Sequence, residues 1–335
     1  MQSKLTNIAD ATLSAMLKLP IGKVDIVIDT DAFNEIDDQF AITYAMLSPE
    51  QLNVKAFYAA PFFNENSENP ADGMEKSYQE IIRVLDKMHL SHKTEVLKGS
   101  ENYLQNENTP VKSPAALHLI ELAKNYTERR PLYVVSIGAL SNIVSAIMMS
   151  PEIMKKIVVV WLGGHPYDWH TASEYNLNQD FKASKFLFTS CVPLVHIPCK
   201  NVSEKLQTSL PDIKANVKGR GKIGDYLYSI FDKHLITYSL KSKPIWDIAN
   251  IAYLVNRNWM QAVITGRPGL KDDKTWDTEN RGAICKTVTD IKRDNVFEDF
   301  FAKLDNFSLN AKMKILDIEE KTIKSEAVYN NGRKA

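Results

Sequence analysis

The sequence has no excess of charge of either sign and no long hydrophobic run. Its 335 residues include 41 basic and 41 acidic side chains, so the net charge is zero when the histidines are neutral. A chain without net charge creates no overall field that attracts nucleic acid or an anionic membrane. No apolar stretch reaches the roughly 18 residues that a membrane span needs. We therefore predict neither a nucleic-acid nor a membrane partner.

Cysteine is also scarce, and the N-terminus lacks the features of a secretory signal. The three cysteines, Cys191, Cys199 and Cys285, have no metal-type spacing, and their odd number argues against a disulfide framework. Residues 1–20 have no basic start, unbroken apolar core or small-residue cleavage site. Their apolar spacing instead predicts a short amphipathic helical extension. We expect a protein of a reducing compartment, the cytoplasm.

Apolar runs alternate with segments of helical periodicity along most of the chain. An apolar run opens at Val24, and further strands are expected over 54–60, 132–137, 157–162 and 192–197. Helices are expected over 36–47, 74–88, 113–126, 140–149 and 181–189. This alternation predicts an α/β fold with a mainly parallel, Rossmann-like central sheet and helices on both faces. Because no linker or repeat interrupts it, we expect one domain over 1–335, with a helical C-terminal region.

The most informative stretch is residues 24–42, VDIVIDTDAFNEIDDQFAI, where five acidic residues crowd one strand-to-helix turn. They are Asp29, Asp31, Glu35, Asp37 and Asp38. Like charges held this close repel one another unless protons or a cation neutralise them. Capping of the following helix explains one or two of these acids. The remainder indicate a site for a divalent cation, which prefers carboxylate oxygens.

Other polar segments also follow predicted strands. The segment PFFNEN follows the second strand, Ile137-Gly138 ends a later one, and GGHPYDWHTASEYN follows the next. In open parallel sheets, ligands bind beyond the carboxyl ends of the strands. We therefore expect these segments to meet the acidic turn along one rim of the sheet.

The pattern D-x-D followed by D-D resembles the signature of the inosine-uridine nucleoside hydrolases, with two additional residues between the second and third Asp. The resemblance implies a Ca²⁺-dependent hydrolase that cleaves the N-glycosidic bond of ribonucleosides. It implies metal ligation by Asp31, Asp38, the main-chain carbonyl of Ile137, and Asp247. Asp31 would also be the general base, and Asp29 would support the site. Family members are commonly homodimers or homotetramers, so the same is possible here.

The segment Glu174-Tyr175-Asn176 resembles the E-F-N of the same family. The resemblance implies that Glu174, Asn176 and Asp37 bind the sugar hydroxyls. The alternative is a capped loop before the helix at residue 181, for which Asn and Asp are common.

Two family features are missing from the substrate site. Trp246 stands where the family has a His that assists departure of the base, so His165 and His170 become the candidate proton donors. Both can equally be surface or structural residues. The family's sugar-binding Asn after the second strand has no plain counterpart, and Asn64 is the candidate to replace it. The predicted substrate-binding set therefore includes Asn64, Trp246 and His165.

Two other functions stay open at this point. With the same fold and metal, the substrate can be a non-nucleoside sugar conjugate of carbohydrate metabolism, as the Trp246 position and the missing Asn suggest. Alternatively, the chain is a non-catalytic protein that binds calcium or a sugar. Measuring product release from a panel of ribosides distinguishes these hypotheses.

Overall fold

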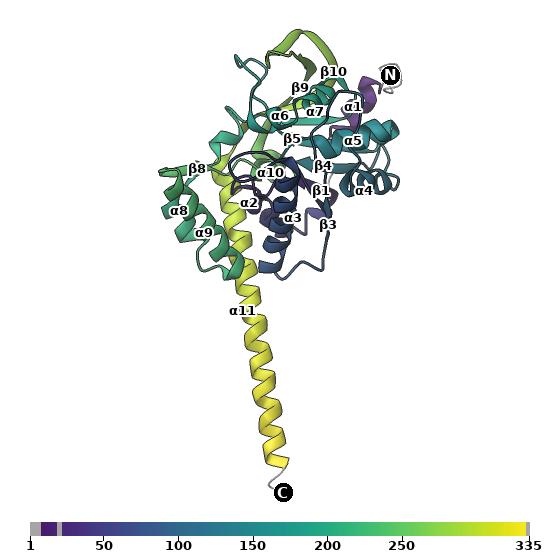
Figure 1. The fold of residues 1–335 in the computed structure, drawn as a ribbon. Coiled ribbons are helices and arrows are strands. Elements are labelled where there is room, and N and C mark those ends of the chain that lie inside the picture. Colours follow the sequence, from purple (N-terminus) through teal and green to yellow (C-terminus); the bar gives the residue numbers. More distant parts are fainter. Residues whose placement is uncertain (1–7, 19–21, 333–335) are drawn as a thin grey trace.

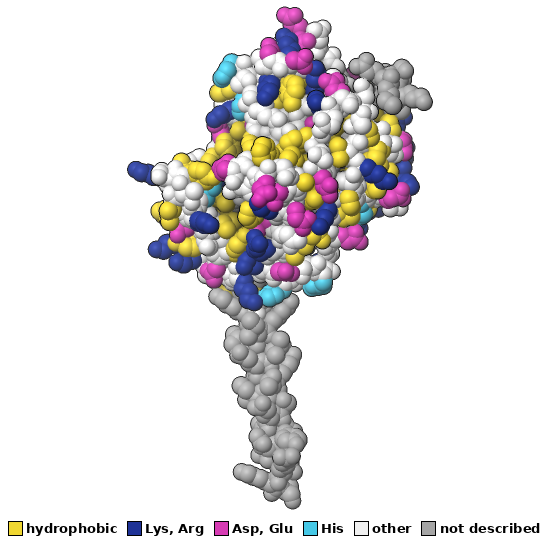
Figure 2. Space-filling view, viewed as in Figure 1, with side chains coloured by type: hydrophobic (Ala, Val, Ile, Leu, Met, Phe, Trp, Pro, Cys, Tyr) yellow, Lys and Arg dark blue, Asp and Glu magenta, His cyan; other side chains and the backbone are white. Residues whose placement is uncertain are grey.

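The structure is a computed structural model that describes residues 8–18 and 22–332. Within these ranges, α1 (Asp10–Met16) confirms a helix in the predicted N-terminal extension, of which residues 1–7 and 19–20 lie outside the described part. No helix among the described residues is both long enough and apolar enough to cross a bilayer. On the face shown in Figure 2, basic and acidic side chains are interspersed with apolar ones.

The described residues form a central sheet of eight strands in the order β3-β2-β1-β4-β5-β6-β10-β9. The strands are β1 (Val24–Thr30), β2 (Leu52–Ala59), β3 (Glu95–Lys98), β4 (Leu132–Ser136), β5 (Ile157–Leu162), β6 (Leu194–Ile197), β9 (Met260–Leu270) and β10 (Trp276–Ile291). All neighbouring strands pair in parallel except β10 and β9. The order 3-2-1-4-5-6 is that of Rossmann folds, so the predicted fold class is confirmed.

Helices cover both faces of this sheet and bury two apolar cores (Figure 1). One core packs under α2 (Asp38–Met46), α3 (Pro70–Lys87), α9 (Gly221–Thr237), α10 (Ile248–Val255) and the start of α11 (Arg293–Gly332). The other packs under α4 (Pro114–Ala123), α5 (Ser141–Met149) and α7 (Phe181–Thr189). In β1, Ile26 and Ile28 enter the first core and Val27 enters the second. This alternation follows from the period of two along a strand.

The C-terminal third differs from the prediction. Helices α8 (Leu210–Asn216), α9, α10 and α11 are present, together with the short strands β7 (Gln207–Ser209) and β8 (Ser242–Pro244). However, β9 and β10 form an antiparallel hairpin that joins the sheet beside β6, so the expectation of a last strand at 192–197 is wrong. The hairpin lacked a strand signal because much of it is exposed and β9 contains Gly266, Pro268 and Gly269. As the ribbon in Figure 1 shows, α11 extends away from the rest of the molecule.

Candidate active site

The candidate site lies at the carboxyl ends of β1 and β4, which are neighbours in the sheet. From β1 the chain continues to β2 on one side of this pair, and from β4 it continues to β5 on the other side. The carboxyl ends of β1 and β4 are therefore the switch point at which ligands bind in such sheets. A cavity of about 990 Å³ opens here. Its walls include Asp31, Asp37, Asp38, Asn64, Ile137, His165, Glu174, Tyr175, Asn176, Trp246 and Asp247. The predicted rim is therefore present, and the predicted metal-binding and substrate-binding residues line one cavity.

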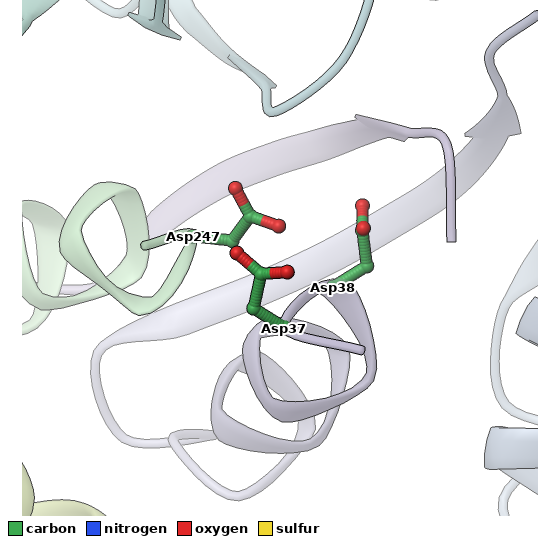
Figure 3. A group of neighbouring side chains, drawn as sticks. All are labelled: Asp37, Asp38 and Asp247. Carbon is green, nitrogen blue, oxygen red and sulfur yellow. The ribbon is translucent and has the colours of Figure 1, made fainter. Parts of the chain in front are cut away.

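Three buried carboxylates converge on one wall of this cavity (Figure 3). Asp37 and Asp38 stand at the N-terminal end of α2, and Asp247 directly precedes α10. One oxygen from each of the three lies within 4.8 Å of the others. Asp38 and Asp247 were predicted metal ligands, whereas Asp37 was assigned to the sugar. The structure thus adds Asp37 to the group of carboxylates that faces a common point.

These carboxyl groups resist ionisation in the absence of a cation. Burial, followed by the charge of Asp37, raises the pKa of Asp38 to about 8. Burial also raises the pKa of Asp37, to about 6, although the nearby Lys243 ammonium opposes the shift. The pKa of Asp247 is raised well above its usual value by burial and by Asp37. The hydroxyl of Thr30 stabilises the charged form of Asp38 through a 2.5 Å hydrogen bond.

Asp31 lies beside this group with both carboxylate oxygens buried and without a hydrogen-bond partner among the described residues. Burial and the charge of Asp38 raise its pKa well above the usual value. Gly138 leaves room for it, since a Cβ added at that glycine would stand 2.9 Å from Asp31 Oδ1. Buried polar groups without partners are rare and require an explanation. Uncommitted carboxylate oxygens next to three further carboxylates fit a hard divalent cation.

Ile137 lines the same cavity, and its main-chain carbonyl is the fourth predicted ligand. It accepts a 3.3 Å hydrogen bond from Asn176 Nδ2. Because a carbonyl oxygen has two lone pairs, this contact leaves one for a cation. The main-chain N–H of Ile137 donates to the carbonyl of Asp29 at 2.9 Å, which extends the β1–β4 pairing to this point.

Lys243, which the sequence reasoning missed, brings a positive charge to the acidic turn. Its side chain is only 5% exposed, and its Nζ lies 2.5 Å from Glu35 Oε2 and 3.7 Å from Asp37 Oδ1. Glu35 belongs to the Ala32–Ile36 segment, which is two residues longer than the family pattern. The lengthened turn thus carries the carboxylate that pairs with Lys243. The only sequence signal was the position of Lys243, four residues before Asp247.

Asn142 of α5 holds the carboxylate of Asp29, whose role in supporting the site stays a prediction. Asn142 Nδ2 donates to Asp29 Oδ1 at 2.8 Å and to the carbonyl of Ala59 at 3.2 Å. Burial raises the pKa of Asp29 to about 7, and the Asn142 hydrogen bond limits that rise. The bonds from Asn142 tie the ends of β1 and β2 to the start of α5.

Glu174 and Asn176 line the cavity, but the protein already uses much of their polar surface. The Glu174 carboxylate caps α6 (Tyr175–Gln179), accepting main-chain N–H groups of Asn176, Leu177 and Gly164 at 2.8 to 3.1 Å. Asn176 Nδ2 donates to Ile137 and to the carbonyl of Leu162. The capped-loop alternative is therefore present in the structure. A role of both residues in sugar binding stays a prediction.

The remaining predicted residues differ in their contacts. Asn64 Nδ2 donates to Asn34 Oδ1 at 2.7 Å, so it is bound to the acidic turn. The main chain of Trp246 lowers the pKa of the Asp37 carboxyl group, against the larger effect of burial. His165 is 8% exposed, and its Nδ1 is buried without a partner among the described residues. Its pKa is lowered by burial, then by the charge of Lys200. His170, the other candidate proton donor, is not among the residues that line the cavity.

The β9–β10 hairpin holds the loop that carries His165. Trp276 Nε1 donates to the carbonyl of His165 at 3.2 Å. The carbonyl of Lys274 accepts from the N–H of Ala172 at 2.7 Å and from Thr171 Oγ1 at 3.2 Å. This loop, residues 165–173, is thereby fixed at both ends by a hairpin that the sequence did not reveal.

The sequence model of the inosine-uridine preferring nucleoside hydrolases matches residues 26–298. The chain belongs to this family. Membership confirms the predicted family and, at the level of the family, the predicted class of N-glycosidic hydrolase. Family members are metal-dependent, and the buried acidic cluster of such a site is present here.

Individual relatives are distant. Probable uridine nucleosidase 2 of Arabidopsis thaliana is 25% identical over 249 residues, which are 68% of this chain and 76% of that protein. A putative pyrimidine-specific ribonucleoside hydrolase, RihB of Shigella boydii, is 34% identical over 131 residues, 37% of this chain and about half (53%) of that protein. A solved inosine-guanosine nucleoside hydrolase superposes with a TM-score of 0.68 at 14% identity, covering 84% of this chain and 98% of that one. Such a low identity shows the shared fold alone.

Proposed function

We propose that this protein is a Ca²⁺-dependent ribonucleoside hydrolase that releases ribose and a free base. The observation that carries the proposal is the uncommitted, buried carboxylate of Asp31 beside Asp37, Asp38 and Asp247 in one cavity. The names of the relatives, a uridine nucleosidase and a pyrimidine-specific ribonucleoside hydrolase, support a nucleoside substrate. Calcium is the proposed cation because it accepts about 6 to 8 oxygen ligands in flexible geometry.

Asp31, Asp38, Asp247 and the Ile137 carbonyl would hold the cation, and Asp37 would bind a sugar hydroxyl. The cation supplies the charge that acidifies and positions a water molecule. Asp31 would accept a proton from the attacking water, whose oxygen bonds to C1′. The C1′–N bond breaks, its electron pair leaves with the base, and the released base takes up a proton. The carboxylates around the sugar stabilise the positive charge that develops on it. Asp29, held by Asn142, keeps the end of β1 in position.

Substitution of Asp31 tests this function. With Ca²⁺ present, the wild type should release product from at least one of uridine, inosine, nicotinamide riboside or p-nitrophenyl riboside. Asp31→Asn should lower kcat by about 10² to 10⁴, the contribution expected of a positioned general base. Chelation should abolish turnover, and added Ca²⁺ should restore it.

The matched control is Asp25→Asn, because Asp25 lies at the opposite end of the same strand and outside the cavity. Its kcat should equal that of the wild type. Near-normal turnover by Asp31→Asn would remove Asp31 from the mechanism.

A second substrate class, a non-nucleoside sugar conjugate, is favoured by Trp246. An indole has no transferable proton for a departing base, but it can stack on a ring or cover a sugar face. Hydrolysis of p-nitrophenyl riboside without hydrolysis of any natural nucleoside would favour this class.

A further inference from the structure

Tyr175 brings an unused hydroxyl group to the cavity. Its side chain lines the cavity wall, and its phenol oxygen is buried without a hydrogen-bond partner among the described residues. Buried hydroxyl groups are almost always hydrogen-bonded in proteins. A phenol oxygen without a partner, in a residue that lines a ligand cavity, indicates that a ligand provides the partner.

The surroundings of Tyr175 keep its hydroxyl group protonated. Burial raises its pKa, and the charge of Asp31 raises it further, with smaller effects from Tyr103 and Glu35. The hydroxyl group is therefore a neutral hydrogen-bond donor that stands near the proposed general base. Nearby Tyr103 differs, because its hydroxyl already donates to Gln179.

The neighbours of Tyr175 in the E-Y-N segment are already engaged. The Glu174 carboxylate accepts three main-chain N–H groups, and Asn176 Nδ2 donates to two carbonyls. After β2, the chain continues with Ala60 and Pro61, which offer no polar side chain. Within the E-Y-N segment, the phenol of Tyr175 is thus the side-chain donor that the described residues leave uncommitted.

We propose that Tyr175 is a substrate-binding residue whose hydroxyl group hydrogen-bonds one hydroxyl of the substrate's sugar. The inference rests on the proposed function, because that function places a sugar in this cavity. A phenol suits the role, since it donates one hydrogen bond and accepts another from a sugar hydroxyl. A phenylalanine, the residue at this position in the E-F-N pattern, offers neither. Substrate binding by this chain should therefore depend on one sugar hydroxyl through a hydrogen bond that the Phe of E-F-N cannot form.

The test combines Tyr175→Phe with removal of single sugar hydroxyls. For a ribonucleoside that the wild type hydrolyses, Tyr175→Phe should lower kcat/KM about tenfold, mainly through KM. With the 2′-, 3′- and 5′-deoxy analogues, the variant should match the wild type for one analogue, because that analogue lacks the contacted hydroxyl. Tyr126→Phe is the matched control, because it loses a phenol that bonds Asp25 outside this cavity. Tyr126→Phe should have the same kcat/KM as the wild type for the ribonucleoside and for each deoxy analogue.

Calorimetric binding of ribose in Ca²⁺ separates this inference from the proposed function. In one outcome, the wild type hydrolyses no nucleoside but binds ribose, and Tyr175→Phe binds ribose about tenfold more weakly. This outcome supports the Tyr175 contact, whereas the proposed function fails. If the wild type and Tyr175→Phe are both active and have the same KM and the same affinity for ribose, only the Tyr175 contact is overturned. A loss of the same size for every deoxy analogue also overturns it. A wild type that neither hydrolyses nucleosides nor binds ribose overturns both proposals.

Discussion

Replacing Lys243 with Met should destabilise the cation-free protein and increase the benefit of calcium. Methionine keeps most of the length of the side chain but carries no charge. The Lys243 ammonium lies 3.7 Å from Asp37 Oδ1, which corresponds to about 4 kcal/mol of attraction at an effective dielectric constant of about 20. Breaking one side of a buried ion pair costs about 3 to 5 kcal/mol. Because the Glu35 side chain is 44% exposed, solvent screens that contact and it adds little.

We therefore expect Lys243→Met to lower the free energy of unfolding by about 3 kcal/mol in EDTA, which corresponds to a Tm lower by roughly 6 °C. The loss should be larger at pH 8.5 than at pH 6. Without Lys243, the pKa of Asp37 rises above its present value of about 6, so ionising Asp37 costs more folding free energy. Added Ca²⁺ should raise the Tm of the variant more than that of the wild type, because the cation replaces the missing positive charge.

Thermal melts in EDTA and in Ca²⁺ measure both effects. The control is Lys205→Met, whose ion pair with Asp290 is about half exposed and should change stability by no more than about 1 kcal/mol. If Lys243→Met melts like Lys205→Met and gains no more from Ca²⁺ than the wild type does, Lys243 does not balance the charge of the acidic turn.

Two further predictions concern protons. The folded-state pKa values of Asp29, Asp37 and Asp38, about 7, 6 and 8, exceed the usual 3.8, so their contribution to stability is complete below about pH 4 and is lost as the pH rises to about 8. In EDTA the Tm should therefore fall between pH 5 and pH 8.5, and saturating Ca²⁺ should flatten the slope; a Tm that rises in EDTA contradicts this. Trp246→His should increase kcat for uridine by about tenfold or more relative to p-nitrophenyl riboside, because imidazole can protonate a departing base. Equal changes for both substrates would exclude that role.

The part of the site that could be predicted from the sequence is the part encoded locally. An apolar run followed by clustered acids defines β1 and the acidic turn, since burial and charge both leave a signal within a few residues. Asp247 is far from that turn in the sequence. It was identified because its segment resembles a family pattern, and the structure places it beside Asp37 and Asp38.

The features that escaped prediction depend on long-range contacts. Lys243 and Glu35 are 208 residues apart, and neither position is unusual until the fold brings them together. Tyr175 was read only as the middle of a motif, because the missing partner of its hydroxyl is a property of the packed cavity. The β9–β10 hairpin was missed because its partly exposed strands lack the continuous apolar runs of β4 and β5.

The hairpin also determines the order in which the cavity can form during folding. The loop at 165–173 is fixed by Lys274 and Trp276, which follow it by about a hundred residues. A chain that has folded only as far as α10 already contains every carboxylate of the acidic cluster, but it lacks these anchors. Contacts between such distant segments form slowly because a long loop must close first. The carboxylates can therefore gather before the loop at 165–173 is anchored, so we expect the complete cavity to form late in folding.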